Sequence, residues 1–241
     1  KGGRLLADRL YHQIPDSGEG AKDTDYALTS YAYDTGGRVD RVTTPGGTIR
    51  QQKFNAMGWV TEELTGTAAG NMVITVKNQY DDHSTLKGDG LLTRVTTLVD
   101  GSSSNDRVTV LAYDWRQRQE TASVSVVLAG SATPVTLFTL NTYDNCSFVT
   151  AVKQYRISIA GPNLIDSSAT NIDILGRAYQ TIRYEVNPTT AAVGNNLISN
   201  TWYDPTGRVL VQWPAGSQAY QSRVYDAAGR VTTAYTAYQP G

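Results

Sequence analysis

The chain has 241 residues, of which 40% are hydrophobic, and its 21 basic and 22 acidic residues leave a formal net charge of -1. Because charges of both signs are interspersed, the sequence has no electrostatic footprint for DNA or RNA, and no apolar run reaches the roughly 18 residues of a membrane span. A single cysteine, Cys146, excludes an internal disulfide framework.

The aromatic composition indicates a thin structure. The chain contains 15 Tyr but only 3 Phe and 4 Trp, and its mean hydropathy is -0.34. Tyr, Thr and Val suit strands that have a solvated face. We therefore predict an all-β protein, built as a wide sheet with two polar faces rather than around a thick core.

Residues 1–25 form a leading segment before the repeats. Residues 8–14 are its one weak candidate for a helix, and residues 16–25 have the composition of a polar loop. Adventitious cation binding by that loop is the minor alternative, because hard cations accept many arrangements of oxygen ligands.

A heptad of the type Tyr-Asp-x-x-Gly-Arg-Val recurs eight times between residues 26 and 241. Clear copies cover residues 33–39, 203–209 and 225–231, and weaker copies begin at Phe54, Tyr80, Tyr113, Tyr143 and Ile172. Successive copies begin 21 to 33 positions apart, so the repeat unit is short and accepts insertions. We predict one continuous array over residues 1–241 that is a fragment of a larger protein.

Each heptad has the residues of a hairpin turn. Asp at the first position of a type I turn accepts a hydrogen bond from the backbone two residues on, and Gly follows where the chain needs a left-handed conformation. Asp34 and Gly37 illustrate the pattern. The tyrosine before the turn and the Arg-Val pair after it are then the ends of two facing strands.

A second turn separates successive heptads. In the shortest unit this is Pro45-Gly46-Gly47, and longer units place their extra residues at 66–71, 100–106, 128–134, 160–168 and 186–196. The exception is the heptad at Tyr80, which is stretched over residues 81–90. We expect tight turns along one edge of the sheet and variable loops along the other.

The arginines that follow the turn glycine are Arg38, Arg177, Arg208 and Arg230. Each can pair with the aspartate of its own turn and stack on a tyrosine of the adjacent strand, which predicts a structural ladder; a surface for anionic glycans is the alternative. The residues assigned to the structural repeat motif are Tyr33, Asp34, Gly37, Arg38, Tyr80, Asp81, Tyr113, Asp114, Tyr143, Asp144, Asp173, Gly176, Arg177, Tyr203, Asp204, Gly207, Arg208, Tyr225, Asp226, Gly229 and Arg230.

With this recurring heptad the chain resembles the Rhs/YD-repeat family, which includes bacterial polymorphic toxins, the BC shell of insecticidal toxin complexes and the teneurin adhesion receptors. The resemblance extends roughly from Tyr26 to Tyr235. It implies a long antiparallel β-ribbon that winds into a hollow spiral shell, which in the toxin members encloses a toxic domain. The self-cleaving aspartates that follow the repeats in those members have no counterpart here, so autoproteolysis is not carried over.

Few residues suggest chemistry. His12 and His83 are the only histidines, and neither lies in a pattern typical of a nucleophile or a metal ligand set. The acidic segment 100–106 lacks the glycine and the terminal glutamate of a calcium loop, and Cys146 is a variable residue of a turn. We expect no enzyme activity, no cofactor, no metal site and no catalytic residue.

Two hypotheses for function follow. The first is a structural segment of a large secreted or surface-displayed bacterial protein, whose partners are the neighbouring repeats of the parent chain and an encapsulated toxin domain. The second is an adhesive or filament-forming extracellular module. It binds glycans through exposed aromatic residues, for which the candidates are Trp59, Trp115, Trp202 and Trp213, or associates with itself through open strand edges. Neither hypothesis involves nucleic acid or insertion into a membrane.

Overall fold

The computed structural model describes residues 3–81, 89–100, 102–103, 105–127, 134–158 and 161–238. The chain divides into two compact units, Lys1–Thr109 and Val110–Gly241. All regular structure in the described residues is β-strand, and strands that follow one another in the chain pair antiparallel. The predicted all-β class and the antiparallel hairpin repeats are thus confirmed.

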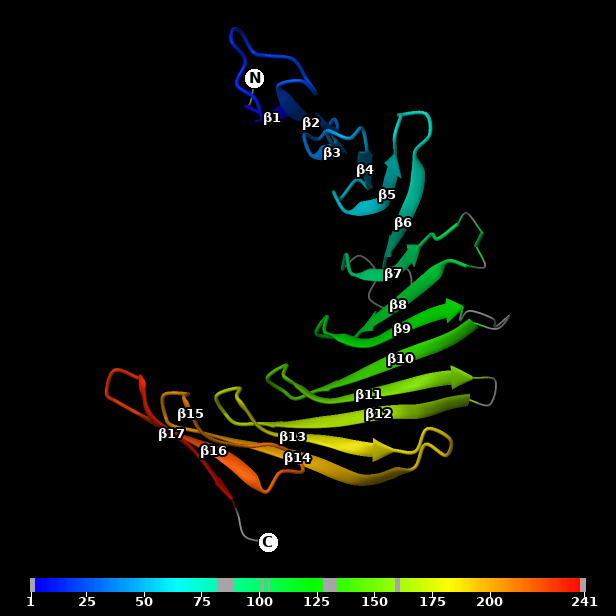
Figure 1. The fold of residues 1–241 in the computed structure, drawn as a ribbon. Helices are drawn as coiled ribbons and strands as arrows, with labels where there is room; N and C mark the ends of the chain where they lie inside the picture. Colours follow the sequence, from blue (N-terminus) through cyan, green and yellow to red (C-terminus); the bar gives the residue numbers. More distant parts are fainter. Residues whose placement is uncertain are drawn as a thin grey trace. The chain divides into compact units, whose positions relative to one another are not determined.

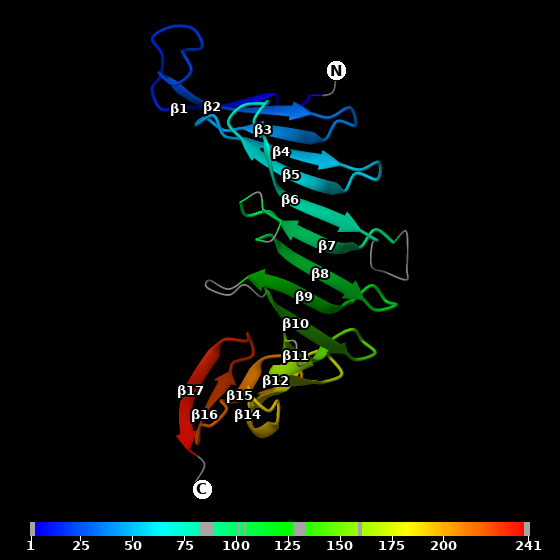
Figure 2. The ribbon, with the colours of Figure 1, turned by 90° about the vertical axis from the view of Figure 1, so that its right-hand side faces the viewer.

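The first unit is a succession of hairpins. Its strands are β1 (Ala7–Tyr11), β2 (Tyr26–Tyr33), β3 (Val39–Thr43), β4 (Ile49–Phe54), β5 (Val60–Gly66), β6 (Val73–Tyr80) and β7 (Leu92–Thr97). Each pairs with the next, from β1 to β7, so β2 to β6 are occupied on both edges. The turns made by the heptads lie along one edge of this unit, on the right in Figure 2, and the second turns lie along the other.

Strand β8 (Arg107–Tyr113) contains the boundary between the units. The second unit continues with β9 (Gln119–Val127), β10 (Pro134–Tyr143), β11 (Val149–Ser158), β12 (Gly161–Ile172), β13 (Ala178–Val186), β14 (Val193–Tyr203), β15 (Val209–Trp213), β16 (Ala219–Tyr225) and β17 (Val231–Tyr238). Each strand from β9 to β17 again pairs with its successor. Its heptad turns also share one edge, which is on the left in Figure 1.

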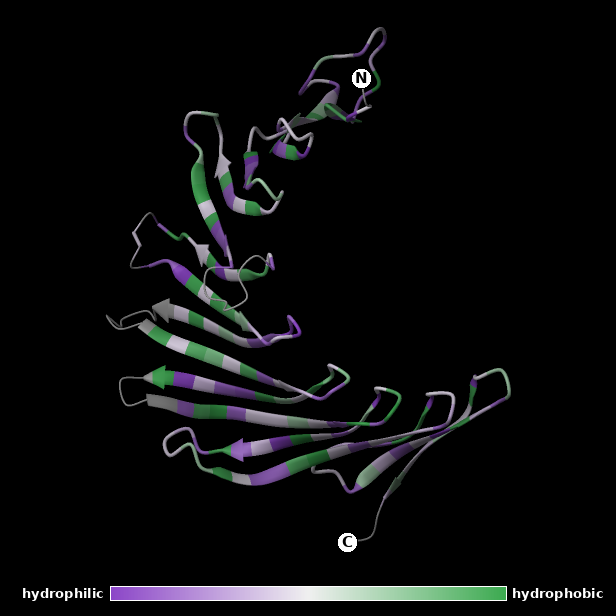
Figure 3. Ribbon diagram, turned by 180° about the vertical axis from the view of Figure 1, so that it is seen from behind, coloured by the Kyte–Doolittle hydropathy of each residue, from purple (hydrophilic) through white to green (hydrophobic). Residues whose placement is uncertain are grey.

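The buried interior is small. Only three hydrophobic side chains among the described residues are buried, namely Tyr26, Ile49 and Leu64. In the second unit, hydrophilic and hydrophobic residues are interspersed along the strands (Figure 3). Stability therefore comes from strand pairing and from contacts between neighbouring repeats more than from a packed core.

The one weak candidate for a helix, residues 8–14, is not helical. Residues Ala7–Tyr11 form β1, which pairs with β2 from Ala7 opposite Ser30 to Tyr11 opposite Tyr26. A helix of one or two turns gains too few hydrogen bonds to offset its nucleation, whereas the edge of β2 offers a complete ladder.

Two of the predicted long loops are shorter than expected. Residues from Gly161 onward belong to β12, and a bulge opposite Gln154 and Tyr155 absorbs the unmatched residue. Similarly, β14 already begins at Val193, so the loop after β13 covers only residues 187–192. The polar residues at 166–168 and 194–196 suggested loops, but they are compatible with strands because both faces of this sheet accept polar side chains.

Candidate functional site: a ladder of turn arginines

The heptad builds the same turn in copy after copy. We number its positions one to seven, so that in the first copy Tyr33 is position one, Asp34 two, Gly37 five, Arg38 six and Val39 seven. The amide of Asp34 donates to the carbonyl of Arg38 over 2.9 Å, and the amide of Gly37 donates to the carbonyl of Asp34 over 3.0 Å. The same two bonds recur in the copies that begin at Phe54, Tyr113, Tyr143, Ile172, Tyr203 and Tyr225.

Position five always adopts a left-handed conformation in these seven copies. Its φ is +82° at Gly37 and at Gly229, and a non-glycine residue is held there at Gln117 (+62°) and Ser147 (+70°). A glycine at this position avoids the steric penalty that a Cβ atom brings at positive φ. The preference for glycine in the heptad thus has a backbone cause.

The stretched copy at Tyr80 keeps the ends of this turn. The amide of Asp81 donates to the carbonyl of Leu91 over 3.0 Å, and the Asp81 carboxylate accepts the amide of Gly90 over 2.9 Å. Residues 82–88 lie outside the described residues, and His83 is among them. The expectation that the insertion extends this turn stays a prediction for that stretch.

The aspartate at position two holds the arginine at position six with both of its oxygens. In the first copy, Asp34 Oδ1 accepts the Arg38 amide over 2.9 Å and Oδ2 accepts Arg38 Nε over 2.7 Å. The same side-chain bond, from Nε to Oδ2, measures 2.5 to 2.7 Å in the pairs Arg118–Asp114, Arg177–Asp173, Arg208–Asp204 and Arg230–Asp226. This pairing makes the guanidinium a rigid part of the turn.

These bonds change the acidity of the aspartates. The backbone N–H of Arg38 and then its guanidinium lower the pKa of Asp34, and the side chain of Arg177 does the same to the pKa of Asp173. For Asp204, burial acts to raise the pKa, but hydrogen bonds from Thr206 and Arg208 outweigh it and lower the pKa well below the ordinary value. The turn carboxylates are therefore held in the ionised form.

Each arginine then reaches the next repeat. The guanidinium of Arg118 lies over the ring of Tyr143 at 4.5 Å from the centroid, and its Nη1 donates to the carbonyl of Asp144 over 3.0 Å. Equivalent contacts join Arg177 to Tyr203 and Asp204, and Arg208 to Tyr225 and Asp226. In the first unit, Arg38 lies over the ring of Phe54 at 4.4 Å.

The tyrosine at position one returns a bond to the preceding repeat. Its hydroxyl donates to the carbonyl of position seven in the copy before it, over 2.7 to 2.9 Å, in the pairs Tyr80–Val60, Tyr143–Gln119, Tyr203–Ala178 and Tyr225–Val209. A phenylalanine such as Phe54 supplies the ring without this bond. We call the combined contacts of position two, position six and the next position one the turn ladder.

The turn ladder coincides with a constant strand register. In six pairings between neighbouring copies, the residue two after position seven lies opposite the residue three before the next position one: Arg41–Gln51, Glu62–Lys77, Thr121–Leu140, Ala151–Ala169, Gln180–Asn200 and Val211–Ser222. Loops at the second turn vary in length while this register does not. The register at the turn edge is therefore independent of the length of the second turn.

Two copies replace the arginine with an aromatic residue. Trp59 lies 5.1 Å from the ring of Tyr80, centroid to centroid, and also packs against the turn glycine Gly90. Phe148 packs against Gly176 in the turn of the following copy. In both places the contact between repeats is kept by ring packing instead of a cation over a ring.

The motif assignment overlooked two arginines of the ladder. Arg118 lies at position six of the copy that begins at Tyr113, which counting from the tyrosine would have found. Arg4 lies over the ring of Tyr33 at 5.3 Å, and Tyr33 donates its hydroxyl to the carbonyl of Leu5 over 2.7 Å. The sequence signal for Arg4 is the run Gly-Gly-Arg-Leu at residues 2–5, which repeats Gly-Gly-Arg-Val at residues 36–39.

The strand register supports the same assignment for Arg4. If Leu5 is position seven, the residue two after it is Ala7 and the residue three before Tyr33 is Ser30. Ala7 lies opposite Ser30 in the β1–β2 pair. The leading segment thus contributes the last positions of a further heptad.

The remaining candidates for chemistry lie apart from one another. His12 is exposed and its Nε2 bonds with the carbonyl of Thr24 over 2.9 Å, and Cys146 is exposed in its turn. Asp100 binds Asn105 and the amide of Ser102 within its own loop. Within the described residues, no group of three or more His, Cys, Asp or Glu side chains is placed to hold a metal ion, and no helix long and apolar enough to cross a membrane is present.

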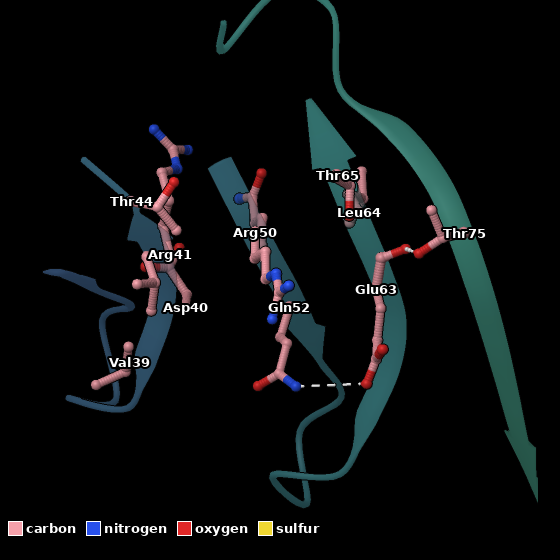
Figure 4. Close-up of a pocket in the computed structure, with 12 residues that line it drawn as sticks. Val39, Asp40, Arg41, Thr44, Arg50, Gln52, Glu63, Leu64, Thr65 and Thr75 are labelled. Atoms are coloured by element: carbon pink, nitrogen blue, oxygen red, sulfur yellow. Dashed lines mark hydrogen bonds between the residues drawn. The ribbon is translucent and has the colours of Figure 1, made fainter. Parts of the chain in front are cut away.

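A groove of about 600 Å³ lies across β3 to β6 in the first unit (Figure 4). Its walls carry charges of both signs, from Asp40, Arg41, Arg50 and Glu63. Gln52 donates to the Glu63 carboxylate over 3.4 Å, and Thr75 donates to the Glu63 carbonyl over 3.2 Å. No histidine, serine or cysteine is among the described residues that line it.

A second groove, of about 440 Å³, lies on β14, β15 and β16 in the second unit. Its walls are almost wholly apolar: Trp202, Leu210, Val211, Trp213 and Tyr220. Trp213 donates its indole N–H to the carbonyl of Ser217 over 2.6 Å, which fixes the ring, and Trp202 is 46% exposed. Two of the four tryptophans singled out from the sequence, Trp202 and Trp213, thus meet on one short stretch of sheet, whereas Trp59 and Trp115 lie outside it.

No family model and no curated protein sequence matches the chain. Among solved structures, it is similar to the crystal structure of TcdB2-TccC3-Cdc42, with a TM-score of 0.41 and 12% identity over 86% of this chain and 13% of that one. It is also similar to the Tc holotoxin pore of Photorhabdus luminescens that carries a TccC3 mutation, with a TM-score of 0.42 and 14% identity over 86% of this chain and 12% of that one. The crystal structure of TcdB2-TccC3 gives a TM-score of 0.40 and 12% identity over the same 86% of this chain and 13% of that one. The chain thus spans about an eighth of the length of these toxin-complex chains, a likeness too low in TM-score to carry an argument about function.

Proposed function

We propose that the chain is a non-enzymatic wall segment of a large secreted or surface-displayed bacterial protein, and that its hairpins form part of a shell around a toxin domain. The observation that carries the proposal is the turn ladder with its constant register. Each repeat adds two strands in the same register and contacts only its neighbours, so the sheet can grow in width without a growing core. Such a construction suits a wall.

The resemblance of the heptad to Rhs/YD repeats supports the enclosing role, because in the toxin members of that family the ribbon surrounds a toxic domain. The polar character of both sheet faces is compatible with a wall that has water on either side. The neighbouring repeats of the parent chain and an enclosed toxin domain are accordingly the partners that we propose.

The proposal of a non-enzymatic role is supported by how the ionisable groups are used. The ladder aspartates are held ionised by their arginines, so they are poor proton donors or acceptors near neutral pH. His12 bonds with a backbone carbonyl rather than with a nucleophile. We expect His12→Ala to change neither fold nor function.

Cryo-electron microscopy of the natural protein that contains this chain tests the enclosing role. We expect a hollow shell in which these strands form part of the wall, together with separate density for an enclosed domain. Limited proteolysis should spare that domain until the shell is opened by denaturant. An open fibre, or a toxin domain that is cleaved at the rate of an exposed one, would contradict the proposal.

The alternative, an adhesive module that binds glycans, is favoured by one observation, the aromatic groove of Trp202, Trp213 and Tyr220. Aromatic faces stack on the apolar faces of sugar rings. Glycan-array binding that is lost in Trp202→Ala and kept in Trp115→Ala would favour this function over the wall. Trp115 is a suitable control because it is 75% exposed and lies outside the groove.

A further inference from the structure

Arg230 differs from the other ladder arginines in what lies around it. It binds Asp226 as they bind their own aspartates, through Nε to Oδ2 over 2.7 Å. Its side chain is nevertheless 80% exposed, against 18% for Arg118 and 25% for Arg177. In the part of the chain that the structure describes, no aromatic ring is recorded against its guanidinium.

In the part of the chain that the structure describes, the strand beside Arg230 is paired along one edge only. β17 pairs with β16 from Ala219 opposite Tyr238 to Tyr225 opposite Val231. No pairing of its other edge is found among the described residues, and seven of its eight residues are exposed. Val231 occupies position seven, the position whose carbonyl accepts the hydroxyl of the next tyrosine in four other copies.

We infer that β17 and Arg230 form a binding site for one further antiparallel β-strand, and that this site selects a strand ending in Tyr-Asp. The inference rests on the proposed function as a wall segment. It adds which kind of strand the unpaired edge of β17 binds. It follows from continuity with the repeated interface, because Arg118, Arg177 and Arg208 present the same groups to the strands that they bind.

The interface that already exists between repeats specifies the contacts. The tyrosine ring of the incoming strand lies against the Arg230 guanidinium, and its hydroxyl donates to the carbonyl of Val231. The residue three before that tyrosine lies opposite Thr233, as Ser222 lies opposite Val211. Arg230 Nη1 donates to the carbonyl of the incoming aspartate, as Arg208 Nη1 does to that of Asp226.

A labelled peptide with the sequence of residues 219–227 tests the inference against the purified 241-residue chain. This segment is the strand that Arg208 binds within the chain, and it ends in Tyr225-Asp226 and one further residue. We expect saturable binding by fluorescence anisotropy. A Tyr225→Ala peptide should bind about tenfold more weakly, since it loses the ring contact and the hydroxyl bond, and a Tyr225→Phe peptide about threefold more weakly.

Substitutions in the 241-residue chain test the same contact from the other partner. Arg230→Ala should weaken binding of the unchanged peptide about tenfold. Arg183→Ala is the control, because Arg183 is similarly exposed, at 73%, and binds Asp166 outside the ladder. Its affinity for the peptide should stay unchanged.

Cysteine crosslinking tests the register independently of affinity. In a Cys146→Ser background, a Ser222→Cys peptide should form a disulfide with Thr233→Cys and not with Tyr235→Cys, because only residue 233 lies opposite in the expected register. Equal crosslinking at both positions would overturn the inference.

Three other results would also overturn it: no binding, binding that ignores the peptide tyrosine, and a dimer of the chain through β17 that excludes the peptide. The dimer would compete with the peptide for the same edge of β17, because the same register would place Tyr238 of a second copy opposite Arg230. The microscopy of the natural protein does not depend on these measurements, so a failed edge site and a failed wall are distinguishable.

Discussion

Asp204 shows why position two of the heptad is an aspartate. Its side chain, the one buried carboxylate among the described residues, accepts hydrogen bonds from the amide and hydroxyl of Thr206 and from the amide and guanidinium of Arg208. An asparagine could accept some of these bonds, as Asn55 does from the amides of Met57 and Trp59. Only a carboxylate also pairs with the charge of the arginine that continues to the next repeat.

Replacement of Arg208 by alanine should destabilise the protein by about 1–2 kcal/mol, because it removes a charged hydrogen-bond pair and a contact with the Tyr225 ring. Arg230→Ala is the matched control, since its side chain is 80% exposed; it should cost no more than about 0.5 kcal/mol. Chemical denaturation followed by circular dichroism measures both. Equal losses in the two variants would show that the contact with the next repeat contributes nothing.

Stability should fall in acid. The pKa values of Asp34, Asp114, Asp173, Asp204 and Asp226 are all lowered in the folded state. A lowered pKa contributes stability that is fully present above the unfolded value of about 3.9 and is lost as the pH falls from there through the folded value. We therefore expect the thermal midpoint to be constant between about pH 5 and pH 7 and to drop below about pH 4.

The variant Asp204→Asn tests the origin of that drop. It should be less stable than the parent chain at neutral pH, and it should lose less stability on acidification, because one titrating group with a lowered pKa has been removed. Thermal midpoints at constant ionic strength give the comparison. An acid drop of unchanged size in the variant would assign the effect to other carboxylates.

At the scale of the hairpin, the two classes of turn differ in how constant their structure is. The heptad turns have a fixed geometry, whereas the second turns range from Pro45-Gly46-Gly47 to the segment between β13 and β14. In the seven copies whose strand pairing is recorded, a bulge lies between position one and the residue before it, as between Ala32 and Tyr33, and a bulge re-aims the side chain beside it. This places the ring within reach of the preceding arginine.

Restoration of glycine at position five should stabilise a weaker copy. Gln117 is held at a φ of +62°, where a side chain is strained, and no hydrogen bond of that side chain is recorded in the described residues. Gln117→Gly should raise stability by about 0.5–1 kcal/mol. The reciprocal change Gly229→Ala, at a φ of +82°, should lower it by about 1 kcal/mol.

Thermal or chemical denaturation of the two variants checks the sign of both effects. Gly46→Ala serves as a control, since Gly46 has no positive φ and a Cβ would meet nothing within 4 Å. Stability unchanged by Gly229→Ala would show that this turn relaxes to another conformation.

For the whole chain, the repeat arrangement predicts that the free energy of unfolding is close to a sum of contributions from individual repeats and from the contacts between neighbouring repeats. The ladder arginines Arg38, Arg118, Arg177 and Arg208 each contact both their own turn and the adjacent repeat, and few of the described side chains are buried in a common core. Stability of this kind is close to additive over sites that share no partner, and fails to be additive within one contact. The prediction of a single array over residues 1–241 remains open at this scale.

Double-mutant cycles measure this property. Arg38→Ala combined with Arg177→Ala should change stability by the sum of the single effects within about 0.5 kcal/mol, because the two arginines share no partner. Arg208→Ala combined with Tyr225→Ala should deviate from the sum by more than about 0.5 kcal/mol, because these side chains contact each other. Strong coupling between Arg38 and Arg177 would contradict the additive picture.

Local residue chemistry made much of this protein predictable from its sequence. The turn residues Asp34 and Gly37 act over a few bonds, so their spacing alone predicted the hairpins, the all-β class and the pairing of each arginine with its own aspartate. Missed members of the ladder, Arg4 and Arg118, carried a usable signal in their position within the heptad.

Other features were decided only by tertiary structure. Strand β1 and the start of β12 depend on the edge of a neighbouring strand, which can order a polar or weakly patterned segment that has no strand signal of its own. The partner of each arginine beyond its turn, such as Tyr203 for Arg177, lies 26 residues away and is chosen by register. Register arises when two strands meet in space. For that reason the exposure of Arg230, and the edge of β17 that has no pairing among the described residues, could be found only in the folded chain.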